Sequence, residues 1–187
     1  MSKLSLNRRQ IIAATAATGV ALTASSVAHA ADDNAKPDLT GKSILITGSS
    51  SGFGYLGAIY YAELGAQVYA TMRNIPRAEA TTLSEKAKAD NLAITVIPLD
   101  VLSDESVDTA VALAEELNGG ALDVVINNAG IGTGAPVELQ DLETMQLVFD
   151  TNVMGYQRVA RAVLPKMRAK KTGHIFNVSS QLGRVMV

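Results

Sequence analysis

Residues 47–54 read Thr-Gly-Ser-Ser-Ser-Gly-Phe-Gly, and this stretch decides the fold that the sequence predicts. It follows an apolar run over residues 43–46 that is typical of a strand. It precedes residues 55–64, whose apolar positions recur at helical spacing. Glycine therefore stands where a strand turns sharply into a helix, and Gly48 can adopt a backbone conformation that is closed to most residues. The N–H groups at a helix N-terminus are unpaired and carry partial positive charge, which suits a pyrophosphate. The stretch indicates a dinucleotide-binding site.

The glycines alone leave two other interpretations open. A Gly/Ser-rich surface loop can have the same composition, because glycine fingerprints often occur without a ligand. A P-loop is disfavoured, because no Lys follows the second glycine, Gly52, to reach a phosphate. Other stretches of the chain are therefore needed to decide between a nucleotide site and a loop.

Strands and helices are predicted to alternate along the rest of the chain. Gly65 is expected to end the first helix, and Ser103 is expected to cap the third helix. Pro165 could kink the last helix. Because the strands are continuous apolar runs separated by helices, we expect a doubly wound, Rossmann-like α/β fold with a parallel sheet. The predicted strands cover residues 43–47, 67–71, 93–98, 122–127 and 174–178, and the helices cover 55–64, 77–89, 104–118 and 142–168.

Length and composition limit the possible functions. The chain has 187 residues, which is enough for one domain with a substantial core. Its net charge of -2 gives no reason to expect a nucleic-acid partner. It contains no Cys, so disulfides and thiolate metal sites are excluded, and its two His residues are too far apart in sequence to suggest a metal site.

The N-terminus has the layout of an export signal. A basic head that includes Arg8 and Arg9 precedes an uncharged, Ala/Thr-rich stretch over residues 11–28, and residues 28–30 resemble a signal-peptidase site. The arginine pair resembles a twin-arginine signal, although Asn7 and Ile11 depart from the usual pattern. We expect residues 1–30 to be a signal peptide, residues 31–38 a polar linker, and the protein to reach a bacterial periplasm. A cytoplasmic location is the alternative if the signal is not functional, and no stable membrane span is expected.

The spacing of the three glycines, four and then two apart, resembles the Thr-Gly-x-x-x-Gly-x-Gly signature of the classical short-chain dehydrogenase/reductase family. Other stretches match the family in the same order, and together they extend over residues 39–187. We therefore expect these residues to form the nucleotide-binding domain of such an enzyme. The matching stretches are Asp100-Val101, Asn127-Asn128-Ala129-Gly130, Asn152 within the long helix, and Asn177-Val178-Ser179-Ser180.

The resemblance implies an NAD(P)-dependent oxidoreductase that transfers hydride between nicotinamide and a small carbonyl or alcohol substrate. In the family, the Asp at position 100 contacts the adenine ring with help from the next N–H. At the end of the second strand, Arg73 can pair with the 2′-phosphate of NADP, whereas NAD would favour a carboxylate there. NADP is therefore favoured over NAD, and a solvated surface Arg is the alternative reading. The expected cofactor-binding residues are Gly48, Ser50, Ser51, Gly52, Phe53, Gly54, Arg73, Asp100, Val101, Asn128, Ala129 and Gly130.

The resemblance also implies two residues for the chemistry. The family places an Asn at position 152 that distorts its helix and holds a water in the proton relay, and a Ser at position 180 that orients the substrate. It further requires a Tyr as general acid/base and a Lys four residues later, about a dozen residues beyond Ser180. The sequence ends at Val187, and no earlier Tyr fits the role, so no catalytic Tyr is assigned. We expect the chain to be truncated, with one edge of its sheet uncovered.

Two functions therefore follow from the sequence. The first is the oxidoreductase, and the second is a non-catalytic NADP-binding protein that has lost the acid/base half. A nucleotide-sugar epimerase is a weaker third reading, since that branch spaces its glycines differently. The substrate is not identified by the sequence, and a homo-oligomer formed through residues 142–168 is expected from the habits of the family.

Overall fold

A computed structural model of the chain describes residues 36–134 and 136–180. The predicted signal peptide, residues 1–30, and residues 31–35 of the predicted linker lie outside the described residues, so both remain predictions. The strands are β1 (Ser43–Ile46), β2 (Gln67–Met72), β3 (Ile94–Pro98), β4 (Val124–Asn127) and β5 (His174–Asn177). The helical segments are α2 (Gly52–Glu63), α3 (Ala78–Ala89), α4 (Asp104–Leu117), the 3-10 turn η1 (Val137–Leu139), α5 (Leu142–Phe149), the π-helical segment η2 (Asp150–Met154) and α6 (Gly155–Lys170).

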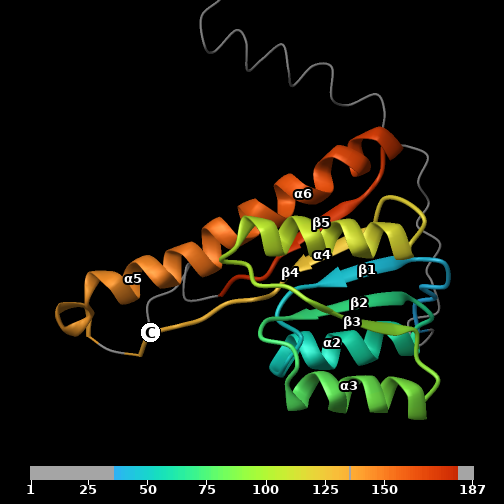
Figure 1. Ribbon diagram of the computed structural model, residues 1–187, viewed down its shortest axis with the longest axis horizontal. Coiled ribbons are helices and arrows are strands. Elements are labelled where there is room, and N and C mark those ends of the chain that lie inside the picture. The colour runs from blue at the N-terminus through green and yellow to red at the C-terminus, as the bar shows by residue number, and fades with distance from the viewer. Residues whose placement is uncertain (1–35, 135, 181–187) are drawn as a thin grey trace, which may run out of the picture. The chain divides into compact units, whose positions relative to one another are not determined.

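The described strands form one five-stranded sheet in the order β3-β2-β1-β4-β5, and each neighbouring pair is parallel. Helices α2 and α3 cover one face of the sheet, while α4 and α6 cover the other (Figure 1). The strand order reverses between β1 and β4, which is the place where ligands bind in open sheets of this kind. The predicted doubly wound, Rossmann-like fold is therefore confirmed.

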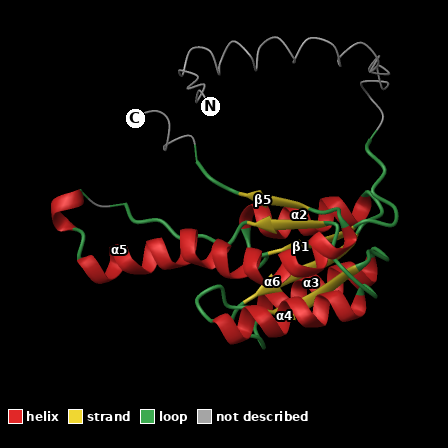
Figure 2. Cartoon of the chain, turned by 90° about the horizontal axis from the view of Figure 1, so that it is seen from above, coloured by secondary structure: helices red, strands yellow, loops and turns green. Residues whose placement is uncertain are grey.

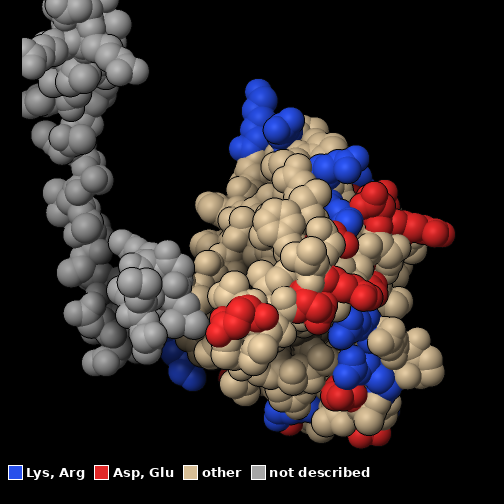
Figure 3. Space-filling model, turned by 90° about the vertical axis from the view of Figure 1, so that its left-hand side faces the viewer, with Lys and Arg blue, Asp and Glu red and all other residues tan. Residues whose placement is uncertain are grey.

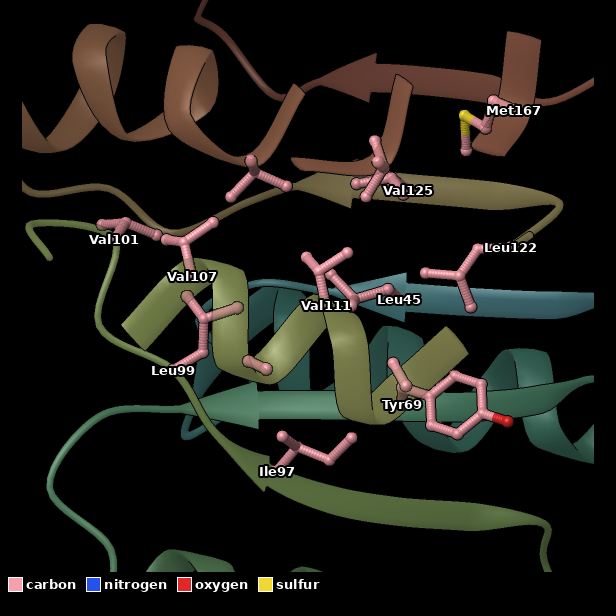
Figure 4. Packing of buried hydrophobic residues seen from close by; sticks show 14 residues of the cluster. Leu45, Tyr69, Ile97, Leu99, Val101, Val107, Val111, Leu122, Val125 and Met167 are labelled. Atoms are coloured by element: carbon pink, nitrogen blue, oxygen red, sulfur yellow. The ribbon is translucent and has the colours of Figure 1, made fainter. Parts of the chain in front are cut away.

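The central strand β1 is buried along its whole length, and its side chains contribute to the hydrophobic core on both faces of the sheet. Leu45 lies between Tyr69 of β2 and Val125 of β4, and these side chains pack toward α4 and α6 (Figure 4). Its neighbours Ile44 and Ile46 point to the opposite face and pack toward α2 and α3. This alternation follows from the pleat of a strand, and it explains why the strand sequence is apolar without interruption.

Helix boundaries differ from the prediction at two places. Helix α2 begins at Gly52 rather than Tyr55, so two of the three glycines belong to its first turn. The predicted single helix over residues 142–168 is interrupted by the π-helical segment η2, while α6 continues through Pro165 to Lys170. Two predicted helix ends are confirmed: Gly65 follows α2 with a φ of +93°, and the Ser103 side chain accepts a hydrogen bond from the Ser106 N–H, at 3.1 Å.

Helix α5 has no buried residue and extends beyond the sheet (Figure 2). The side of the molecule toward which the strands point shows a broad uncharged area beside intermixed acidic and basic side chains (Figure 3). No described helix combines the length and apolar character that a membrane crossing requires. The exposed apolar side chains of η1, α5 and η2 are Val137, Leu139, Leu142, Met145, Leu147, Phe149, Val153 and Met154.

Asp123 joins three elements at the amino end of the sheet. Its carboxylate accepts hydrogen bonds from the N–H and hydroxyl of Ser43, both at 3.0 Å, and from the Lys170 Nζ at 2.9 Å. Partial burial by itself raises the pKa of this carboxyl, but the hydrogen bonds from Lys170 and Ser43 outweigh it, so that the pKa is lowered. Asp123 therefore holds the starts of β1 and β4 and the end of α6 together.

We expect Asp123→Asn to lower the free energy of unfolding by about 2 kcal/mol at pH 7, because an amide cannot accept all the hydrogen bonds that the carboxylate accepts. Folding lowers the pKa of Asp123, so its contribution is present above the unfolded-state pKa and is lost as the pH falls through the folded value. Urea unfolding at pH 7 and pH 3 should therefore show a smaller difference at pH 3. Asp108→Asn, on an exposed part of α4, is the control and should change stability by less than about 0.5 kcal/mol.

Candidate functional site

A cavity of about 370 Å³ lies at the carboxyl ends of the strands, next to the point where the strand order reverses. Four strand ends and the π-helical segment contribute to its wall. The lining residues are Gly48, Ser50, Ser51 and Phe53 after β1, Met72 at the end of β2 with Arg73 and Arg77 beyond it, Leu99, Asp100, Val101 and Leu102 after β3, Asn128, Ala129, Gly130 and Ile131 after β4, and Thr151 of η2.

Two of the three glycines after β1 allow close approaches of the backbone, and the third faces open space. Gly48 has a φ of +71°, and a Cβ there would lie 2.7 Å from the Ala129 Cα. A Cβ at Gly54 would lie 2.3 Å from the Gly48 carbonyl oxygen. Gly52 has a φ of +55°, and a Cβ there would meet no atom within 4 Å, so the space beside the first residue of α2 is open. Two of the glycines thus permit packing, and the third lies at an open helix N-terminus.

The N-terminus of α2 is not capped by the Ser51 side chain. The first N–H groups of a helix have no partner within the helix, so they are available to an anion in the adjacent space. The loop carries no carboxylate that would repel a phosphate. The residues present therefore fit the pyrophosphate of a dinucleotide.

Asn128 and Thr47 hold the β1 loop against the β4 loop. The Asn128 amide nitrogen donates to the carbonyls of Thr47, at 2.9 Å, and Gly48, at 3.1 Å. The Thr47 hydroxyl in turn accepts hydrogen bonds from the N–H groups of Asn128 and Ala129. The sequence analysis did not assign Thr47, nor Ser49, whose hydroxyl donates to the Ile46 carbonyl at 3.1 Å. Both side chains are buried, and their position in the glycine stretch was the signal that could have identified them.

Two arginines line the cavity after β2, and they differ in their partners. Arg77, which the sequence analysis missed, donates two hydrogen bonds of 2.9 Å to Glu79, and these lower the pKa of Glu79 to about 2. Arg73 is exposed and forms no ion pair with any residue in the described ranges. Arg73 is therefore the cation whose charge is available to a ligand at this end of the cavity.

The β3 loop forms the opposite wall. The Asp100 carboxylate accepts a hydrogen bond of 3.1 Å from the Leu102 N–H, and the Asp100 N–H donates to the Ser106 hydroxyl at 2.9 Å. These bonds fix the turn before α4, and they place the buried side chains of Leu99 and Val101 beside the cavity. The Asp100 carboxylate thus lies among the apolar side chains of this wall, and the N–H groups of Leu99, Asp100 and Leu102 are engaged within the protein.

Asn152 lies in the π-helical segment η2, so the helix is distorted where the sequence analysis expected it. Its amide group pairs with the backbone of Ile131: the Nδ2 donates to the Ile131 carbonyl at 2.8 Å, and the Oδ1 accepts from the Ile131 N–H at 2.9 Å. The side chain therefore ties the long helical region to the loop after β4. It does not itself line the cavity, although its neighbour Thr151 does.

Ser180 lies three residues beyond β5, is exposed, and does not line the cavity. Tyr156 of α6 holds the backbone just before it, because its hydroxyl donates to the Val178 carbonyl at 3.1 Å. Burial raises the pKa of Tyr156, so this phenol stays protonated and keeps its hydrogen bond. Tyr156 is one of the tyrosines to which no acid/base role was assigned from the sequence, and its contact with Val178 was not predicted.

Of the predicted cofactor-binding residues, ten line the one cavity and two, Gly52 and Gly54, lie in the first turn of α2 next to it. The two residues predicted for the chemistry, Asn152 and Ser180, lie outside the cavity wall. The structure thus brings the nucleotide-binding candidates together, while their roles remain predictions.

We expect Gly54→Ala to lower the free energy of unfolding by about 3 kcal/mol, because the new Cβ would overlap the Gly48 carbonyl and force the loop to move. Gly57→Ala in the same helix is the matched control. Its Cβ would make an ordinary contact of 3.4 Å with the Tyr61 ring, so the change should stabilise the chain by about 0.5–1 kcal/mol. Urea unfolding monitored by circular dichroism checks both, and equal effects of the two substitutions would contradict the prediction.

Residues 42–187 match the family model of short chain dehydrogenases. The chain is 41% identical to retinol dehydrogenase 8 of Bos taurus over 145 residues, which cover 76% of this chain and 45% of the bovine protein. It is 38% identical to 3-ketodihydrosphingosine reductase of Bacteroides thetaiotaomicron over 146 residues, which cover 76% of this chain and 48% of that protein.

Among solved structures, the fold is similar to a gluconate 5-dehydrogenase from Burkholderia cenocepacia in complex with NADP and tartrate. The TM-score is 0.72 at 31% identity, and the match covers 80% of this chain and 58% of that one. The chain spans about half the length of the curated relatives that it matches. The family match, together with the glycine loop and the cavity above it, shows that the chain belongs to the short-chain dehydrogenase/reductase family.

Proposed function

We propose that the cavity binds a nicotinamide dinucleotide, NADP in preference to NAD, and that the protein is an oxidoreductase acting on a small carbonyl or alcohol substrate. The observation that carries the proposal is the open N-terminus of α2 beside a loop that only glycine can build at positions 48 and 54. This combination supports pyrophosphate binding, because backbone N–H groups and the helix dipole both favour a negative charge there.

The residues of this chain would bind and orient the cofactor, which supplies the hydride chemistry when bound. The first turn of α2 would hold the pyrophosphate, and Asp100 and Val101 would form one side of the nucleotide pocket. Asn128 would act indirectly, since its amide nitrogen is already engaged by the carbonyls of Thr47 and Gly48 and keeps the loop in shape.

The preference for NADP rests on the charges after β2. Both oxygens of Glu79 already accept hydrogen bonds from Arg77, so this nearby carboxylate is engaged. Arg73 forms no ion pair with another residue in the described ranges, and its planar guanidinium suits a phosphate. The related Burkholderia cenocepacia structure, which is in complex with NADP, supports the same assignment.

We expect Arg73→Ala to raise the Kd for NADPH by about tenfold and to change the Kd for NADH by less than about twofold, because only NADPH carries the phosphate that Arg73 would contact. The fluorescence of the reduced coenzyme measures both constants, and the chain contains no Trp that would interfere. Arg168→Ala, at the far end of α6, is the matched control and should change neither constant. An equal loss for both coenzymes would remove Arg73 from phosphate recognition, and no binding of either by the unchanged chain would refute the site.

A non-catalytic nucleotide-binding protein is the second candidate. It is favoured by Tyr156, whose hydroxyl is engaged by a backbone carbonyl. A titration with NADPH, followed by NADPH oxidation assays with a panel of aldehydes and ketones, distinguishes the two. Tight binding without turnover by the 187-residue chain would support the second candidate, and turnover would support the first.

Two further proposals concern the cellular location of the protein and its oligomeric state. The basic head and the uncharged stretch of residues 1–30 support export through a twin-arginine signal, which N-terminal sequencing of periplasmic protein can check. The exposed apolar side chains of α5 support self-association through residues 142–168, which sedimentation velocity can check.

A further inference from the structure

The Arg158 side chain, in the first turn of α6, makes contacts in three directions. Its Nε donates to the Asp104 carboxylate at 3.0 Å, and one terminal nitrogen donates to the Val101 carbonyl at 3.1 Å. The same nitrogen also donates a longer hydrogen bond of 3.5 Å to the Asp150 carbonyl, and the other terminal nitrogen lies 2.8 Å from the Asp150 carboxylate. The Arg158 side chain is only 19% exposed, so the guanidinium itself is largely shielded from water.

These partners belong to two different parts of the candidate site. Val101 is in the cavity wall after β3. Asp150 begins the π-helical segment that contains Thr151, which also lines the cavity, and Asn152, which pairs with the loop after β4. The guanidinium of Arg158 therefore lies between one wall of the cavity and the segment that determines where Asn152 points.

Packing brings the same two parts together. A Cβ at Gly155 would lie 2.9 Å from the Val101 Cβ, so α6 can approach the β3 loop this closely only with glycine at that position. The planar fork of Arg158 then spans the junction, and a Lys could not reach the three groups at once. The contact to Asp104 contributes least, because that carboxylate is 70% exposed and its ion pair is screened by water.

We propose that Arg158 is a positioning residue, which holds the cavity wall after β3, at Val101, in a fixed position relative to the π-helical segment η2. Filling of the cavity and the placement of Asn152 are thereby coupled, since neither part can move without breaking contacts of the same guanidinium. The coupling between cavity filling and Asn152 rests on the proposed dinucleotide site, whereas the contacts of Arg158 with Val101 and Asp150 do not depend on it.

The test compares Arg158→Gln with Arg161→Gln in the full chain. Arg161 lies one turn further along α6 and lines the same surface groove with Asp104 and Asp108, but it forms no ion pair with a residue in the described part of the chain. Hydrogen exchange followed by mass spectrometry, without coenzyme, is the first measurement. Arg158→Gln should speed exchange by about tenfold in residues 99–102 and in residues 150–154 together, with β1 and β4 unchanged, and Arg161→Gln should have no effect.

The second measurement is NADPH binding. Arg158→Gln should raise the Kd by about fivefold and abolish any protection that NADPH gives to residues 150–154, whereas Arg158→Lys should restore part of the affinity. If Arg158→Gln does not fold, Arg158→Lys replaces it in both measurements, because Lys keeps the charge but cannot span the junction.

Three outcomes would overturn the inference: faster exchange in only one of the two segments, uniformly faster exchange throughout the chain, or equal effects of the Arg158 and Arg161 substitutions. Failure of the unchanged chain to bind NADPH would refute the proposed function instead. The exchange measurement would then still decide whether Arg158 holds the junction.

Discussion

The close approach of the loop after β1 to the loop after β4 is the constraint on which the rest of the site depends. Gly48 comes so near to Ala129 that a side chain cannot fit between them, and Asn128 and Thr47 close the junction with hydrogen bonds. This junction sets the direction in which α2 begins, and therefore where its unpaired N–H groups point. The cavity exists because these two loops, which are far apart in sequence, are held in contact.

Local sequence rules were enough to predict most of the elements. The strands are largely apolar runs, buried along β1 and most of β2 but mostly exposed in β5, and their predicted bounds fall within two residues of the observed ones. Gly65 and Ser103 were found because a helix end has its own residue requirements. The nucleotide-binding candidates were predicted from the glycine stretch and from the resemblance to the family, and they lie near one another because parallel strands end at the same edge of the sheet.

The features that sequence reasoning missed depend on contacts between distant segments. The Arg158 contacts join residues separated by 54 and 57 positions, and no local pattern in α6 indicates them. The extent of the π-helical segment follows from the pairing of Asn152 with Ile131, which is a tertiary contact. Arg73 and Arg77 differ in their partners, since Glu79 pairs with Arg77 alone, and the spacing of charges along the chain does not reveal this difference.

Gly48 and Gly54 tolerate far less change in sequence than the exposed Arg73. Any nonsynonymous change at Gly48 or Gly54 introduces a Cβ into occupied space, so these codons are closed to variation as long as the loop is to keep its shape. Arg73 is exposed and forms no ion pair with a residue in the described ranges, so we expect its replacement to leave the scaffold intact. Under the proposed function, a change of coenzyme preference at the end of β2 would therefore leave the shape of the glycine loop unchanged.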